Sequence, residues 1–264
     1  MTAHSATQEW RQYRKAPIVE AVIDIRVVRP KSFSIDSLSE IRSLVADTFP
    51  VVEEMHSGKA VVQVAPDKAT VNIQQENKFD GYRFSSRDNN WIFQSRINAF
   101  AFSVVGFYEG WESLRNTAHR FWTIYRSVGD VDAISRVAVR YINRIDIPEP
   151  EHKEQQIEQK DYLRTYVEVS NDYPCYDLGA FAMQLQIPQP DIDAMLLLNQ
   201  VRVAPPKPNM ASIILDIDLF KDKTTSPWDS SNDVAVWECL DQLRVRKNEI
   251  FEGSITDRTR ELFE

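Results

Sequence analysis

Three arginines at a four-residue spacing, Arg136, Arg140 and Arg144, are the residues whose types and positions suggest chemistry. They lie in the stretch SRVAVRYINRIDIP, residues 135–148, in which polar and apolar residues alternate. Because the side chains of a β-strand alternate between two faces, a strand here places all three guanidinium groups on one face. Each guanidinium offers paired donors that suit phosphate or carboxylate groups. The spacing therefore predicts an anion-binding strand face.

One polar residue interrupts the apolar face of the same stretch. The apolar residues of the other parity are Val137, Val139, Tyr141, Ile145 and Ile147, and Asn143 has the same parity. A polar side chain on a buried face is normally hydrogen-bonded, whereas a bulge would shift the register and move it off that face. Asn143 therefore predicts either a buried, hydrogen-bonded amide or a β-bulge.

A second stretch, Ile18 to Val28, has the same alternation near the beginning of the chain. Its apolar parity contains Ala21, Ile23, Ile25 and Val27, and its polar parity contains Glu20, Asp24 and Arg26. If this strand lies close to the strand over 136–147, their two polar faces combine. We therefore expect the ligand-binding residues to be Arg136, Arg140, Arg144, Glu20 and Arg26.

Aspartates on two predicted strands suggest a divalent cation. Asp216 and Asp218 share one face of the stretch ASIILDIDLF, residues 211–220, and Asp24 lies on the polar face of the first strand. Carboxylates hold Mg²⁺ in enzymes that process phosphate esters. Residues 20–26 read EAVIDIR, however, and lack the E-x-E-x-K pattern of triphosphate tunnel enzymes. Rows of opposite charges also pair across strands for solubility, so a structural interpretation of the same residues stays open.

The acidic balance of the chain disfavours several kinds of partner. Its 264 residues carry 39 acidic and 31 basic side chains, for a formal net charge of -8. This balance disfavours nonspecific attraction to nucleic acid or to an anionic membrane surface. Aromatic residues such as Trp91, Phe93 and Tyr141 could stack bases on a sheet, but their parity favours core packing. We expect no membrane association, and nucleic acid is an unfavoured partner.

The motifs of the common enzyme classes are missing from the sequence. There is no G-x-S-x-G, H-E-x-x-H, P-loop or G-x-G-x-x-G, and the histidines have no metal-ligand spacing. The two cysteines, Cys175 and Cys239, are too few for a disulfide framework. The first residues lack the apolar run of a signal peptide, and AMLLL at 194–198 is far shorter than a membrane span. We expect a soluble cytoplasmic protein without a cofactor, or with Mg²⁺ if it is an enzyme.

Hydrophobic periodicity and turn residues predict the other elements. A capping box of Ser37 and Glu40 begins a helix over 37–49. An antiparallel meander over 51–105 is expected to turn at Ser57-Gly58, Pro66-Asp67, Asp80-Gly81 and Asp88–Asn90. Further helices are expected over 111–126, over 157–169 after an acidic linker, from a cap at Asn232 to about 250, and over 254–263. Further strands are expected over 179–188, 192–203 and 211–220.

The order strand, helix, antiparallel strands, long helix occurs twice along the chain, although the two halves share almost no residue identity. We therefore predict an α+β fold in which long helices pack on an antiparallel sheet. The predicted parts are an N-terminal arm, 1–16, and two similar halves, 17–130 and 131–264, packed as one unit. The layout is analogous to TATA-binding-protein-like and helix-grip folds, and the analogy concerns the fold alone.

Three stretches carry a resemblance to a known family. They are APIVEAV at 16–22, RYINRI at 140–145 and FEGSITD at 251–257, and the helix start at Gly110-Trp111 fits the same pattern. Together they resemble a sporadically distributed family of bacterial proteins of similar length, so the resemblance extends over essentially the whole chain. The family offers no established catalytic residues to transfer. Its patchy distribution implies an accessory gene, such as a toxin-neutralising or phage-defence component.

The missing catalytic motifs and the acidic balance favour a non-enzymatic intracellular bacterial binding protein whose partner is another protein. The alternative is a metal-dependent phosphate-ester or nucleotide-processing enzyme. In that case Asp24, Asp216 and Asp218 hold Mg²⁺, and the arginines bind phosphate. A second alternative is nucleic-acid binding on the sheet surface, with an affinity that falls steeply as salt rises.

Overall fold

The structure is a computed structural model that describes residues 10–64, 71–149, 157–170, 172–174, 178–230 and 233–264. Within 58–64 and 71–77 it describes the backbone only. The described residues form ten β-strands, joined in an antiparallel sheet, and four α-helices. The predicted α+β class with an antiparallel sheet is therefore confirmed.

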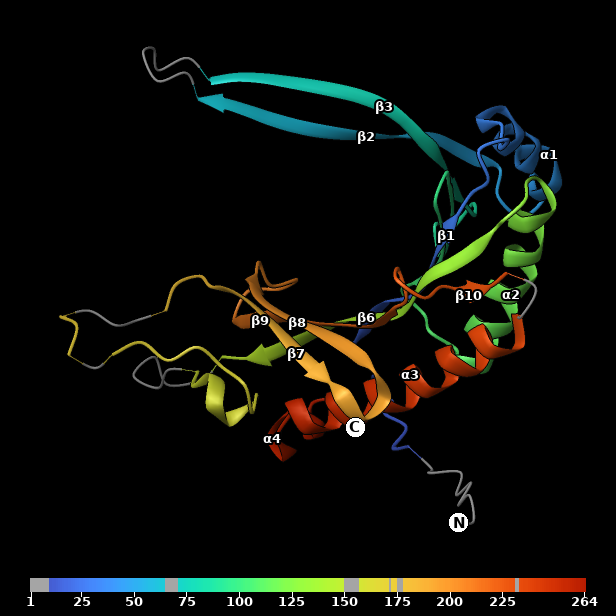
Figure 1. The fold of residues 1–264 in the computed structure, drawn as a ribbon. Helices are drawn as coiled ribbons and strands as arrows, with labels where there is room; N and C mark the ends of the chain where they lie inside the picture. Colours follow the sequence, from blue (N-terminus) through green and yellow to red (C-terminus); the bar gives the residue numbers. More distant parts are fainter. Residues whose placement is uncertain (1–9, 65–70, 150–156, 171, 175–177, 231–232) are drawn as a thin grey trace. The chain divides into compact units, whose positions relative to one another are not determined.

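The elements follow one another along the chain as shown in Figure 1. The strands are β1 (Ile18–Val28), β2 (Val51–Val64), β3 (Val71–Ser85), β4 (Trp91–Arg96), β5 (Ala99–Val105), β6 (Ala133–Pro148), β7 (Ala182–Gln189), β8 (Ala194–Val203), β9 (Met210–Asp222) and β10 (Trp228–Asp229). The α-helices are α1 (Ile41–Val45), α2 (Trp111–Ser127), α3 (Asp233–Ser254) and α4 (Asp257–Glu261). Short 3-10 turns occupy Ile35–Glu40, Gln159–Asp161 and Pro190–Ile192.

The chain forms two compact units. The N-terminal unit contains Glu20–Ala138 and Lys221–Glu238, and the C-terminal unit contains Met1–Val19, Val139–Phe220 and Cys239–Glu264. In the N-terminal unit the strand order is β2-β3-β4-β5-β1-β6, with β10 paired to β6. In the C-terminal unit the order is β6-β9-β8-β7. β7 is therefore the edge strand of the C-terminal unit.

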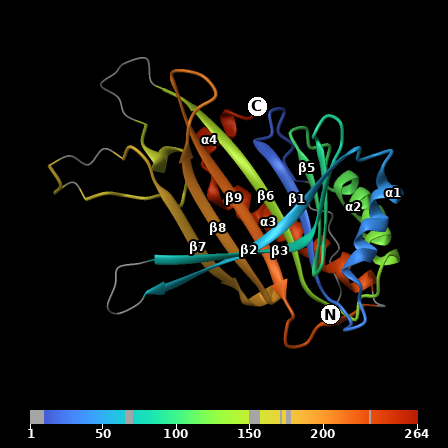
Figure 2. The ribbon, with the colours of Figure 1, turned by 90° about the horizontal axis from the view of Figure 1, so that it is seen from above.

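The core of the N-terminal unit is an aromatic layer between α2 and the strands β4 and β5. Phe121 of α2 stacks on Phe93 and Phe102 at centroid distances of 5.7 and 5.6 Å, and Trp122 contacts Phe100 edge-on at 5.5 Å. All five rings are 0–1% exposed. Figures 1 and 2 show α2 along one side of β5. The parity of these strand aromatics, which favours core packing, agrees with their burial.

Several turns and helices predicted from local sequence differ from the structure. Ser57-Gly58 lies inside β2, where Ser57 pairs with Lys78, because pairing with β3 outweighs the local turn preference. The helix expected over 37–49 is a 3-10 turn followed by the five-residue α1. The helix expected over 157–169 is only a 3-10 turn. The expected turn at Pro66-Asp67 and the cap at Asn232 lie outside the described residues.

Asp80-Gly81 forms a bulge rather than the expected turn. The register of β2 and β3 shifts between Met55, opposite Gly81, and His56, opposite Phe79. Gly81 has a φ of 145°, and a Cβ atom there would lie 2.1 Å from the backbone oxygen of Ser95. Only glycine fits this backbone conformation and this close approach of β4.

The C-terminal unit is organised on β6, whose two faces differ as its sequence predicts. Val137, Val139, Tyr141, Ile145 and Ile147 are all 0% exposed. Asn143, at 2% exposure on the same face, donates through Nδ2 to the carbonyl of Leu215 at 3.1 Å and to that of Tyr141 at 3.3 Å. The buried, hydrogen-bonded amide is thus the correct one of the two predictions for Asn143.

We expect Gly81→Ala to lower the free energy of unfolding by about 2–3 kcal/mol, because the new methyl group meets backbone and the φ angle is strained. Gly253→Ala is the matched control. Gly253 lies in α3 with no atom within 4 Å of an added Cβ, so alanine there should raise stability by about 0.5 kcal/mol. Denaturant unfolding measures both variants, and equal effects of the two would contradict the assignment of the bulge.

Candidate functional site

Arg136 is paired with a carboxylate inside the N-terminal unit. Its Nη1 donates to Oδ1 of Asp24 at 2.6 Å, and Arg136 is only 7% exposed. Nε of Arg26 lies 3.9 Å from the same Asp24 oxygen. A hydroxyl and a backbone N–H of Thr224 lower the pKa of Asp222, and the charges of Arg136 and Arg26 lower it further. Of the polar residues predicted on β1 and β6, the structure thus brings Arg136, Asp24 and Arg26 together.

Arg140 belongs to a hydrogen-bonded row across the C-terminal unit. Its Nε and Nη2 donate to the two carboxylate oxygens of Asp216 at 2.9 and 2.7 Å. Asn199 also donates to Asp216, at 3.0 Å, and Gln184 donates to Asn199 at 2.8 Å. The row therefore links β7, β8, β9 and β6. The bidentate geometry that suits an external phosphate is used here by a buried carboxylate of the fold.

Arg144 is engaged in the same way, further along β6. Its Nε donates to Oδ1 of Asp146 at 2.9 Å, and its Nη2 donates to the carbonyl of Ala204 at 2.9 Å. The hydroxyl of Ser212 donates to the same Asp146 oxygen. All three predicted arginines are therefore bonded to carboxylates of their own unit.

The residues predicted for the metal alternative lie in both units. Asp24 and Asp216 each accept hydrogen bonds from an arginine, and Asp218 lies half-buried on the same face of β9 as Asp216. Glu20 precedes Asp24 by four residues on β1, which is about 13 Å along a strand. Across the described part of the chain, no three His, Cys, Asp or Glu side chains gather as a metal site would require. Asp24 and Asp216 thus act as acceptors for guanidinium groups in the structure.

Lys247 is a buried charged residue that the sequence reasoning missed. It is 7% exposed on α3, with Nζ 3.7 Å from the centre of the Tyr141 ring. Burial is the main reason that its pKa is lowered from 10.5 to about 7; the charge of Arg244 adds to the lowering and that of Glu252 opposes it. Lys247 follows the apolar stripe at Leu240 and Leu243 by four residues, and this spacing could have identified it.

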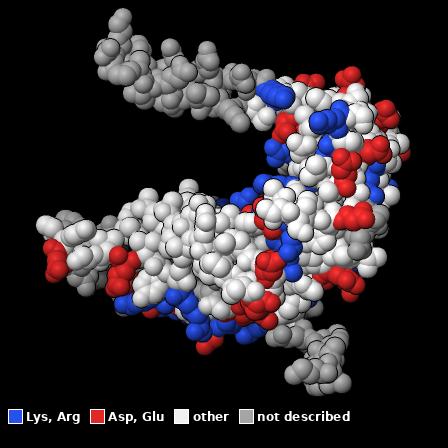
Figure 3. Space-filling view, in the orientation of Figure 1, with Lys and Arg blue, Asp and Glu red and all other residues white. Residues whose placement is uncertain are grey.

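The hairpin of β7 and β8, residues 182–203, is nearly free of charge. Its charged residues are Asp191, Asp193 and Arg202. At the 27% charged content of the whole chain, a segment of this length would carry about twice as many. On β8 the residues with the parity of Leu196 are mostly buried, whereas those with the parity of Leu197 are half-exposed. The surface over β7 and β8 is accordingly white in Figure 3, where charged residues are coloured.

We call the half-exposed side of this hairpin and of β9 the open face. Figure 2 views the C-terminal unit from the side opposite α3 and α4. Four rows of paired residues cross it: Pro188, Met195 and Phe220; Gln186, Leu197 and Asp218; Gln184, Asn199 and Asp216; and Ala182, Val201 and Ile214. The open face therefore combines apolar side chains with two kinds of polar residue. Gln184, Asn199 and Asp216 are hydrogen-bonded to each other, and Gln186 and Asp218 lie on either side of Leu197.

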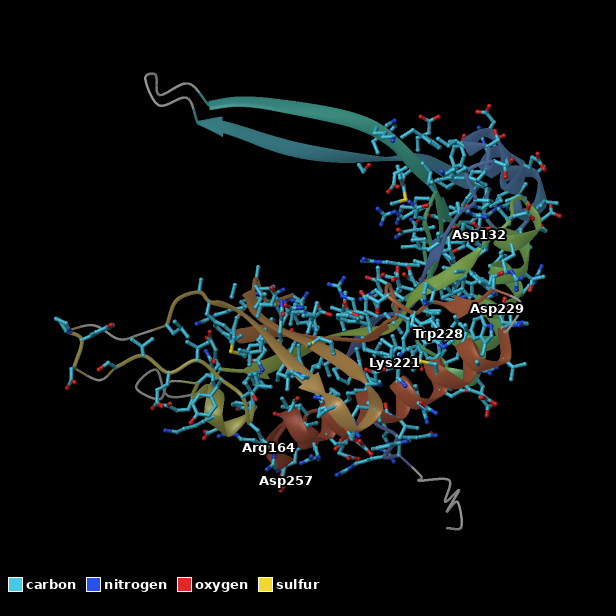
Figure 4. All side chains as sticks on the ribbon, in the orientation of Figure 1. Asp132, Arg164, Lys221, Trp228, Asp229 and Asp257 are labelled. Carbon is cyan, nitrogen blue, oxygen red and sulfur yellow. The ribbon has the colours of Figure 1, made fainter. Side chains whose placement is uncertain are left out.

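The stretches that carry the family resemblance make structural contacts in the C-terminal unit. The N–H of Arg144 donates to the carbonyl of Pro17 at 2.8 Å, joining the first stretch to the second. Arg164, labelled in Figure 4, donates through its backbone to Ser254 at 2.9 Å and through Nε to Ile255 at 3.0 Å. The acceptors in these contacts are backbone carbonyls, so the contacts stabilise the fold of the C-terminal unit.

No protein-family model matches the chain, and neither a curated protein nor a solved structure matches it. The family resemblance therefore stays a prediction. In the part of the chain that the structure describes, no helix is both long and apolar enough to cross a membrane.

We expect Arg140→Ala to lower the free energy of unfolding by about 1–2 kcal/mol. The change leaves the 5% exposed Asp216 without its arginine, and the 47% exposure of the Arg140 side chain limits the loss through solvent screening. Adding Asp216→Asn to the first variant should restore part of the loss. Denaturant unfolding measures the stability of wild type, of the single variant and of the double variant. Arg87→Ala is an exposed control, whose stability should lie within about 0.5 kcal/mol of wild type. A full loss of ligand binding at unchanged stability would instead identify Arg140 as a ligand-binding residue.

We expect Lys247→Met to stabilise the protein more at pH 7 than at pH 9. The pKa of Lys247 is lower in the folded state, at about 7, than the ordinary 10.5, so unfolding takes up a proton between these values. Stability of the wild type therefore rises with pH in this window, and the advantage of methionine should shrink by about 2 kcal/mol from pH 7 to pH 9. Unfolding measured at both pH values tests this, with the non-titrating Leu243→Met as control. A pH-independent difference for Lys247→Met would contradict the burial of a neutral amine.

Proposed function

We propose that this chain is a non-enzymatic binding protein whose partner is another protein, and that the partner contacts the open face of the C-terminal unit. The observation that carries the proposal is the contrast between two parts of one sheet. The arginines of β6 are engaged with internal carboxylates, while β7 carries no charge and β8 presents half-exposed apolar side chains such as Leu197 and Val201. Half-exposed apolar side chains gathered on one face of a sheet are typical of protein contacts.

The chemistry of the open face defines the partner. Leu197, Val201 and Ile214 offer apolar contact, and they flank the row of Gln184, Asn199 and Asp216. A matching partner has an apolar patch, because a charged group placed against Leu197, Val201 and Ile214 would lose its water without gaining an ion pair from these side chains. Amide or hydroxyl groups of the partner could share the remaining acceptors of the polar row.

The family resemblance supports a place for this binding in bacterial physiology. A sporadically distributed accessory protein that neutralises a toxin or serves phage defence acts by holding another protein. Such a role suits a cytoplasmic protein and requires neither a cofactor nor catalytic residues. We further propose that residues 17–130 and 131–264 are related halves of TATA-binding-protein-like or helix-grip-like layout. In support, β1 and β6 are each followed by a 3-10 turn, antiparallel strands and a long helix.

A charge on the open face should abolish partner binding. We expect Val201→Asp to weaken the affinity for the partner captured from the native host by at least about tenfold, since the carboxylate must be desolvated in the complex. The control is Glu261→Arg, an exposed change on α4 in the same unit, which should bind like wild type. Capture by tagged protein, followed by titration of the purified partner, measures this, and melting temperatures confirm folding.

The same preparation tests the enzyme alternative. Turnover of a phosphate ester or nucleotide in the presence of Mg²⁺, lost in Arg140→Ala and combined with no stable partner, would replace the binding proposal. Equal binding by Val201→Asp and wild type would move the partner contact away from the open face.

A further inference from the structure

The edge of the C-terminal sheet is an uncharged strand. β7 has the sequence AMQLQIPQ, is the last strand in the pairing order, and has exposed or half-exposed side chains throughout. Edge strands of soluble proteins usually carry charges that prevent pairing with another chain, and β7 has none. Figure 2 shows β7 as the outermost labelled strand of the C-terminal unit, beside β8.

The register of β7 identifies which backbone groups point outward. The N–H of Arg202 donates to the carbonyl of Phe181 at 3.1 Å, just before β7 begins. Because hydrogen-bonded pairs recur at every second residue of an antiparallel ladder, Met183, Leu185 and Ile187 bond to β8. The N–H and C=O groups of Gln184 and Gln186 therefore point away from β8, toward the edge at which no other described strand pairs.

Pro188 has the same outward parity as these glutamines. Its missing N–H costs no hydrogen bond within the β7 and β8 ladder, which is why an edge strand tolerates proline here. The side chain of Gln189 donates to the Pro188 carbonyl at 3.2 Å. The outward groups ready for pairing are thus concentrated around Leu185, between Ala182 and Pro188.

The sequence of β7 is self-complementary about Leu185. If two β7 strands run antiparallel with Leu185 opposite Leu185, then Gln184 lies opposite Gln186 and Met183 lies opposite Ile187. Amides meet amides on one face and apolar side chains meet on the other, which are favourable cross-strand pairs. The outward groups of Gln184 and Gln186 face each other in this register and form about four backbone hydrogen bonds. In a register shifted by one residue, the outward N–H and C=O groups of one strand would lie opposite residues whose N–H and C=O groups are already bonded to β8.

We propose that β7 is a self-association edge at which two copies of this chain pair antiparallel, related by a two-fold axis through Leu185. The self-complementary pattern selects a second copy as the occupant, because an unrelated strand gains nothing from that symmetry. An isologous two-fold contact also uses each edge once and closes the assembly. One strand per copy buries less than the roughly 1,600 Å² of a standard interface, so the dimer forms and dissociates with concentration. The pairing does not depend on the partner proposed for the open face.

Charge substitution at the two glutamines tests both the pairing and its register. Gln184→Lys combined with Gln186→Lys places lysine opposite lysine twice, whereas Gln184→Lys combined with Gln186→Glu places lysine opposite glutamate twice. Both double variants lose the same Gln184 to Asn199 hydrogen bond, so they are matched in their effect on the monomer. Sedimentation over a wide concentration range should show wild type and the Lys/Glu variant approaching twice 30.6 kDa, and the Lys/Lys variant remaining at 30.6 kDa.

A disulfide tests the register independently of charge. In a chain carrying Cys175→Ser and Cys239→Ala, Leu185→Cys should form an intermolecular disulfide on mild oxidation, because the paired Cα atoms lie about 4.5 Å apart. Met183→Cys is the matched control, since its two copies would lie about 13 Å apart along the strands. A wild type that stays at 30.6 kDa at every concentration, equal behaviour of the two charge variants, or equal cross-linking at 183 and 185 would each overturn the proposal.

Discussion

Each guanidinium on β6 is matched with a carboxylate, and the rest of the structure depends on this matching. A strand with one face at 0% exposure must carry its charges on the other face, where they need either water or an opposite charge. Arg136 meets Asp24 in one unit, and Arg140 meets Asp216 in the other. Asp216, at 5% exposure, is tolerated only because Arg140 and Asn199 satisfy both of its oxygens. The polar face of β6 is thus as constrained as its apolar face.

Hydrophobic periodicity was sufficient to predict β1, β6, β9 and α2, because the pattern of these segments is local. β6, β9 and α2 match their expected ranges closely, and the buried amide of Asn143 is one of the two alternatives that parity left open. The failures occur where tertiary contacts outweigh local preference. Ser57-Gly58 continues as a strand because β3 pairs with it. The chain from Asp161 onward is held by hydrogen bonds to Ser254, at the end of α3, and to Thr256, the cap of α4, rather than by a helix of its own.

The arginine face illustrates the limit of sequence for sites. Spacing correctly placed Arg136, Arg140 and Arg144 on the polar parity, yet the carboxylates that engage them come from distant parts of the chain. Asp216 follows Arg140 by 76 residues, so no short sequence motif contains both residues of the ion pair. Lys247 is the opposite case, because its position on the stripe of Leu240 and Leu243 is visible in sequence while its depressed pKa depends on burial against Tyr141.

The contrast between β6 and β7 follows from the same rule about charge. β6 lies inside the sheet and carries four charged residues of one parity whose partners are built into the fold, whereas β7 lies at an edge and carries none. A charge at an edge blocks pairing because its water would be lost, so a neutral edge leaves the outward groups of Gln184 and Gln186 free to pair. The hydrophobic rows beside that edge raise the cost of leaving it in water. A strand so composed gains hydrogen bonds when a strand of matching register covers it, and the self-complementary sequence of β7 makes a second β7 such a strand.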